Sequence, residues 1–76
     1  LSLRQAATNG TSARIYDLGG ELVVDLGDVA AGATALFWDG RSEDDNFVAN
    51  GVYICYVEAP GSGGYKQTFK IAVKKN

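Results

Sequence analysis

Residues 33–58 contain two alternating, aromatic-rich segments on either side of a polar loop. The second segment, Gly-Val-Tyr-Ile-Cys-Tyr-Val-Glu at residues 51–58, is the strongest strand signal in the chain. Successive side chains of a β-strand point to opposite faces, so a period of two indicates a strand with one buried face. The two faces then carry two sets of side chains: Tyr53, Cys55 and Val57 on one, and Val52, Ile54 and Tyr56 on the other.

Several other segments alternate in the same way and are separated by turn signals. Strands are predicted at residues 1–4, 13–17, 21–26, 34–38 and 65–74, with a short extended piece at 47–48. The turns between them are rich in Asn and Gly, which tolerate positive φ; the clearest are Gly19-Gly20 and residues 59–64. Because no segment has a helical period, the sequence predicts an all-β, antiparallel sandwich of six to seven short strands.

The inward faces of these segments define the expected core. Trp38 is the candidate anchor, since it is the largest side chain and shares a face with Leu36. A chain of 76 residues has room for one domain, residues 1–76, with one thin core. The predicted core residues are Ile15, Leu36, Trp38, Tyr53, Val57, Phe69, Ile71 and Val73.

Composition excludes several classes of protein. The chain is 46% hydrophobic and 21% charged, which is typical of a folded domain. A net charge of −2 gives no basic footprint for nucleic acid, and no apolar run is long enough for a membrane span. The lysines at 66, 70, 74 and 75 are interpreted as a solvated face of the last strand, with an anionic partner as the alternative.

Few residues could support chemistry. The chain has no histidine, and its single cysteine, Cys55, is placed on an inward face where an inert thiol is expected. An acidic cluster at Asp39, Glu43, Asp44 and Asp45 lacks calcium-loop spacing and is interpreted as a solvated turn. We therefore predict no catalytic, metal-binding or cofactor-binding residues and no enzymatic activity.

Four motifs occur in a fixed order along the predicted strands. They are Arg14-Ile15-Tyr16-Asp17-Leu18-Gly19-Gly20, Trp38-Asp39-Gly40-Arg41, Asn50-Gly51-Val52-Tyr53 and Lys70-Ile71-Ala72-Val73-Lys74. This order resembles the Ig-like domain of the flagellar hook-capping protein FlgD over nearly the whole chain, and is similar to the C-terminal sorting domains of type IX secretion cargo. Cys55 departs from the family, which usually has a larger residue there.

The resemblance implies an Ig-like fold and an extracellular, cell-surface or periplasmic bacterial location. An Ig-like sandwich short of a strand has an unpaired edge, which a strand from a partner protein or a neighbouring subunit could fill. The alternation also leaves several apolar residues facing outward as a candidate interface. These predicted interface residues are Phe37, Val52, Ile54 and Tyr56.

Three functions are compatible with these features. The preferred hypothesis is a non-enzymatic structural or assembly module of an extracytoplasmic protein or filament, homo- or hetero-oligomeric. The alternatives are a C-terminal secretion sorting domain and a carbohydrate-binding module that would use exposed tyrosines such as Tyr16, Tyr56 or Tyr65. A chain that starts at Leu1 and lacks methionine is expected to be a processed fragment or C-terminal module of a larger protein.

Overall fold

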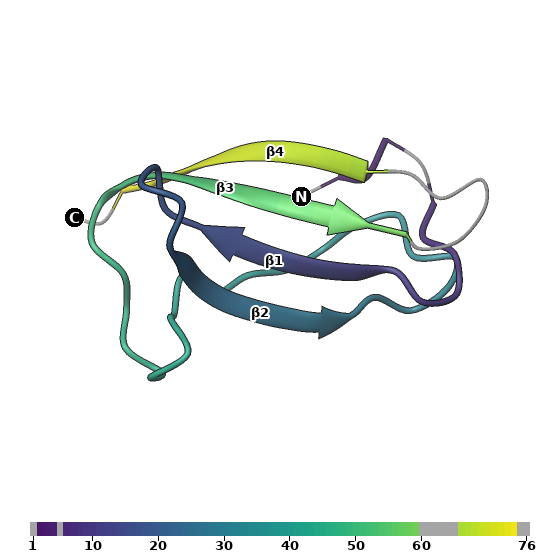
Figure 1. Cartoon of the computed structure of the whole chain (residues 1–76), viewed down its shortest axis with the longest axis horizontal. Coiled ribbons are helices and arrows are strands. Elements are labelled where there is room, and N and C mark those ends of the chain that lie inside the picture. Colours follow the sequence, from purple (N-terminus) through teal and green to yellow (C-terminus); the bar gives the residue numbers. More distant parts are fainter. Residues whose placement is uncertain (1, 5, 60–65, 75–76) are drawn as a thin grey trace.

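The fold is all-β and antiparallel, as the sequence predicted, and its described strands form one sheet. The computed structural model describes residues 2–4, 6–59 and 66–74, and within them it contains strands but no helix. The strand order across the sheet is β2-β1-β3-β4, which puts β2 and β4 at the edges (Figure 1). The strands are β1 (Ser12–Tyr16), β2 (Leu22–Asp28), β3 (Gly51–Glu58) and β4 (Lys66–Val73).

A tight turn joins β1 to β2 at the predicted Gly-Gly position. The amide of Gly20 donates to the Asp17 carbonyl at 3.1 Å, and Gly20 has a φ of 87°, a conformation that glycine adopts without strain. The Asp17 carboxylate accepts a bond from the amide of Glu21 at 2.9 Å. Local turn chemistry therefore sets the register of this hairpin.

Strand β3 lies at the centre of the sheet, between β1 and β4. It pairs antiparallel with β4 along its whole length and with β1 over residues 54–58, so that Cys55 faces Ile15 on one side and Phe69 on the other. Its burial alternates as the sequence predicted, because every second side chain faces the interior. Tyr53, Cys55 and Val57 are buried, whereas Ile54 and Tyr56 are half-buried on the opposite face.

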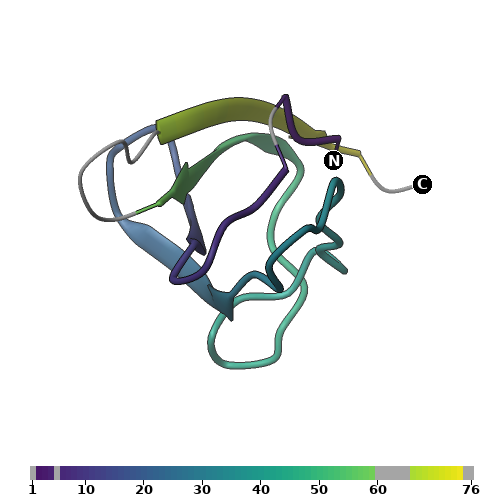
Figure 2. The same ribbon diagram turned by 90° about the vertical axis from the view of Figure 1, so that its right-hand side faces the viewer.

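The second layer is irregular rather than a second sheet. Figure 2 shows the N-terminal segment (purple) and residues 30–50 (teal) on the concave side of the sheet. In the described residues of these segments, the β-bridges are isolated ones, between Ser2 and Ala35 and between Arg41 and Phe47. We define the covering layer as residues 2–4, 6–8 and 29–50. Side chains from it pack against the sheet; they include Leu3, Leu36, Trp38 and Val48.

The predicted count of six to seven strands is therefore corrected to four among the described residues. The predicted strands at residues 1–4 and 34–38 do meet, but their pairing slips. The amide of Leu3 donates to Thr34 O at 2.8 Å and that of Ala7 to Ala33 O at 2.9 Å. One segment advances four residues while the other advances one, so no continuous ladder forms.

β2 runs two residues further than predicted, to Asp28. Two bulges in its pairing with β1 let Val23, Val24 and Leu26 all pack against the core. Tyr65 and most of the predicted turn at residues 59–64 lie outside the described residues.

Candidate interaction surfaces

The predicted core residues lie between the sheet and the covering layer. Ile15 and Val57 are fully buried and Tyr53 nearly so. Trp38 meets Tyr53 edge to face at 5.7 Å between ring centroids, and its indole N–H donates to the Arg41 carbonyl at 2.9 Å. The others are partly buried against the same cluster: Leu36, Phe69, Ile71 and Val73.

The predicted interface residues do not form one patch. Val52, Ile54 and Tyr56 lie on β3 and face away from the covering layer, on what we call the outer face of the sheet. Phe37 belongs to the covering layer, between two side chains that pack inward, and is 84% exposed. Phe37 therefore lies on a different layer from the three β3 residues, and the strands beside β3 are β1 and β4.

Aromatic and charged side chains order the outer face. Tyr16 and Tyr56 meet edge to face, with centroids 5.3 Å apart and planes at 78°. This angle does not give the flat platform on which a sugar ring would stack. The ammonium group of Lys66 lies 4.6 Å from the centre of the Tyr56 ring and 3.7 Å from a carboxylate oxygen of Glu58.

An ion pair crosses the outer face between β1 and β2. The Arg14 guanidinium donates to the Asp25 carboxylate at 3.3 Å. The backbone amide of Gly27, at 2.8 Å, and the Arg14 guanidinium hold the pKa of Asp25 below its usual value. This pair is solvent-exposed, so it fixes local geometry more than it stabilises the fold.

A loop residue, Glu43, forms hydrogen bonds with backbone groups on the outer edge of β2. The backbone amide of Glu43 donates to Val23 O at 3.1 Å, and a Glu43 carboxylate oxygen accepts from the amide of Asp25 at 2.8 Å. One residue thus replaces both a donor and an acceptor of a neighbouring strand. Such a cover prevents edge-to-edge pairing. This role could not be predicted from the sequence, because Glu43 lies in an aperiodic polar loop.

The free edge of β4 is largely open. The Arg4 guanidinium donates to Thr68 O at 2.9 Å, and the Arg4 amide donates to the side chain of Gln67 at 2.7 Å. Beyond Thr68, the described part of the chain supplies no hydrogen-bond partner on this side to the backbone of Lys70 or Ala72. Among the described residues, β4 is therefore the more open of the two sheet edges.

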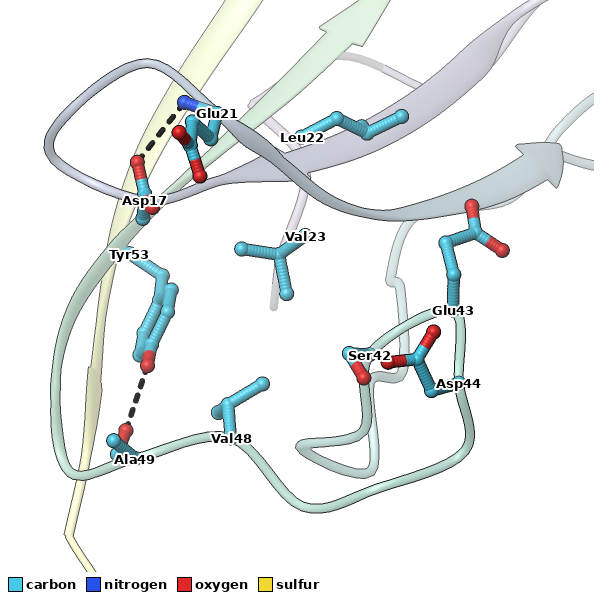
Figure 3. Close-up of a pocket in the computed structure, with 10 residues that line it drawn as sticks. All are labelled: Asp17, Glu21, Leu22, Val23, Ser42, Glu43, Asp44, Val48, Ala49 and Tyr53. Carbon is cyan, nitrogen blue, oxygen red and sulfur yellow. Dashed lines mark hydrogen bonds between the residues drawn. The ribbon is translucent and has the colours of Figure 1, made fainter.

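A shallow pocket of about 400 Å³ opens between the β1–β2 turn and the loop before β3. Figure 3 shows Val23, Val48 and Tyr53 around it, with the Tyr53 hydroxyl donating to Ala49 O at 2.7 Å. Its described lining residues include four carboxylates and no cationic side chain. The carboxylates belong to Asp17, Glu21, Glu43 and Asp44.

The acidic residues of the polar loop are spread over different local roles. Asp39 accepts from the amide of Arg41 at 3.1 Å, and Asp45 pairs with the Arg41 guanidinium at 3.1 Å. Glu43 seals β2 as described above. Within the described residues, no group of three or more His, Cys, Asp or Glu side chains could hold a metal ion.

Cys55 is the buried thiol that the alternation predicted. It is fully buried, and burial raises the pKa of the Cys55 thiol above its usual value. The thiol therefore stays protonated and unreactive while the fold is closed.

Comparison with known proteins identifies the family. The model of the FlgD Ig-like domain matches residues 1–63, which is most of the chain. The chain belongs to the FlgD Ig-like domain family. The match covers β1, β2 and β3 and ends before β4. No curated protein and no solved structure gave a significant match.

Family membership confirms the resemblance to the FlgD domain, whereas the resemblance to type IX sorting domains stays a prediction. This FlgD Ig-like domain belongs to a structural and assembly family. No helix in the described part of the chain is long and apolar enough to cross a membrane.

Proposed function

We propose that this FlgD Ig-like domain is a non-enzymatic assembly module of an extracytoplasmic bacterial protein or filament. It joins a protein partner, or a neighbouring subunit, through the β4 edge and the outer face of the sheet. The observation that carries the proposal is the asymmetry of the two edges: Glu43 seals β2, while the backbone of Lys70 and Ala72 on β4 stays available. Membership in a hook-related family supports a location at the cell surface or in the periplasm.

The joining is passive. An added strand would bond to the free backbone groups of β4, and main-chain bonds of this kind give affinity to many strand-addition complexes. Beside that edge, Ile54 and Tyr56 supply apolar surface that a partner would cover; Val52, 41% exposed, extends it. Phe37, on the covering layer, offers a separate exposed aromatic contact.

Site-specific photo-crosslinking in the producing bacterium tests this function. A crosslinker at Thr68, which is exposed on β4, should give a discrete adduct with one extracytoplasmic protein. The same group at Asn9, an exposed turn residue that precedes β1, is the control and should give none. Replacing Ile54 with Ser should remove the Thr68 adduct while the purified domain keeps its strand circular-dichroism signal. Equal adducts at Thr68 and Asn9, or none at Thr68, would refute the assembly role.

A further inference from the structure

We infer that the β4 edge accepts an extended acidic segment of another protein, with Asp or Glu at alternate positions. This inference rests on the proposed function, because it names the partner chemistry of the same edge. It combines two independent features of this edge within the described residues: backbone groups of β4 without a hydrogen-bond partner, and lysines at and just after β4 without an ion pair.

The direction of the β4 backbone groups follows from the pairing. In an antiparallel ladder, alternate residues bond to one neighbour and the remaining residues face the other side. The odd-numbered residues Thr11 and Asp17, on either side of β1, form backbone hydrogen bonds with Val29 and Glu21, next to the ends of β2. The even-numbered residues of β1 therefore bond to β3. Even-numbered residues of β3 therefore bond to β1, and its odd-numbered residues bond to the odd-numbered residues of β4. The backbone N–H and C=O groups of the even-numbered residues of β4 then point away from β3, toward the free edge. The bond from Arg4 to Thr68 O confirms that direction.

The side chains beside those groups are cationic. Lys66 is neutralised by Glu58, at 3.7 Å. Within the described residues, Lys70 and Lys74 make no ion pair, and both are exposed. Lys70 lies on the outer face of β4, and Lys74 directly follows the last residue of the strand, at the same period of two. These lysines therefore lie along one side of the open edge. On the other side of the edge, the Arg4 guanidinium lies 5.1 Å from the centre of the Phe69 ring.

An acidic strand fits this arrangement better than a second copy of the chain. On an added strand, side chains opposite Lys70 and Lys74 lie within about 4.5–5.5 Å of them between Cβ atoms, where opposite charges attract. Two β4 strands paired about Lys70 or Ala72 would instead place lysine opposite lysine, which is destabilising. The lysines thus discourage self-pairing and favour an acidic partner. β2 offers no equivalent site, because Glu43 occupies its edge.

Titration with synthetic peptides tests the inference on the purified chain. The probe is a short peptide that alternates threonine and glutamate, and its controls alternate threonine with lysine or with serine. Amide chemical shifts report where the peptide binds. We expect the acidic probe to shift the amides of Lys70 and Ala72, and the controls not to. Raising the ionic strength to about 1 M, where the Debye length is about 3 Å, should weaken binding.

Two pairs of variants separate charge from backbone bonding. Lys70→Glu should weaken binding by about tenfold, whereas Lys70→Arg keeps the charge and should bind like wild type. Ala72→Pro removes an outward N–H and leaves the bonds to β3 intact, so it should abolish binding. Its control, Ala72→Val, keeps the N–H and should bind. Thermal melts establish that each variant is folded.

The outcomes distinguish this inference from the proposed function. If the serine peptide binds β4 as well as the acidic one does, the edge joins partners without charge selection; the inference fails and the assembly role stands. If the acidic peptide binds Ala72→Pro with the affinity of wild type, it binds the lysines by charge alone without forming a strand, and the inference fails. If no peptide binds but crosslinking at Thr68 succeeds, the acidic-strand partner is refuted.

Discussion

The sheet and its covering layer are built by different means. Across the sheet, β3 pairs over eight residues with β4 and over five with β1, so main-chain bonds form a continuous ladder. In its described residues, the covering layer has isolated bridges and scattered backbone bonds rather than a continuous ladder, and side chains such as Trp38 and Leu36 pack it against the sheet. The hydrophobic core lies between these two unequal layers.

This difference indicates which part of the domain should open first. Regions with few buried contacts and few paired backbone groups open locally at lower free energy than a core sheet does. The proposed partner-binding edge belongs to the sheet, so it should stay rigid when the covering layer fluctuates. The following predictions test that contrast, from the largest expected effect to the smallest.

Removing the anchor of the covering layer should have the largest effect. Trp38→Ala should lower the free energy of unfolding by about 3 kcal/mol, the lower end for a large aromatic, since the ring is only partly buried. The matched control is Phe37→Ala, next in the chain but 84% exposed, which should change stability by less than about 0.5 kcal/mol. Urea unfolding followed by circular dichroism measures both. Equal costs for the two variants would contradict the assignment of Trp38 to the interior.

Breaking the seal on β2 should have an intermediate effect. Glu43→Ala removes the acceptor for the amide of Asp25 and should cost about 1 kcal/mol of unfolding free energy. It should also make the protein self-associate with rising concentration, because a freed edge strand pairs with other chains. Asp44→Ala, an exposed neighbour, is the control. Sedimentation velocity measures the association, and a monomeric Glu43→Ala protein would show that Glu43 does not protect the edge.

The smallest expected effect is a transient opening of the covering layer, which the alkylation rate of Cys55 should report. Its pKa is raised by burial, so the closed fold favours the neutral thiol. The neutral Cys55 thiol contributes to the free energy of unfolding below the pKa of an unfolded cysteine, about 8.5. This contribution is lost as the pH rises through the higher pKa of the folded protein. Alkylation by iodoacetamide should therefore be slow at neutral pH and accelerate above about pH 8.5.

The alkylation rate also separates local from global opening. If the covering layer opens alone, Cys55 should react faster than the global unfolding rate allows, and Trp38→Ala should accelerate it further. If alkylation follows global unfolding in both proteins, the two layers open together, and the contrast between them would be lost.

Much of the sheet could be predicted from local pattern. The alternation in residues 51–58 determined both faces of β3, and the Gly-Gly turn determined the β1–β2 hairpin. Covering-layer segments were harder to predict, because alternation over a few residues indicates extended backbone but not a matching register in a partner. The slip between the pairings of Leu3 and Ala7 is a property of two distant segments together.

The candidate interface divides in the same way. The sequence by itself determined that Val52, Ile54 and Tyr56 share a face, because a strand has a period of two. Only the tertiary structure decided that Phe37 lies on a different layer, that Glu43 closes one edge and that the lysines flank the other. Periodicity is a local property of the backbone, whereas the order of strands in a sheet depends on contacts between residues far apart in the chain.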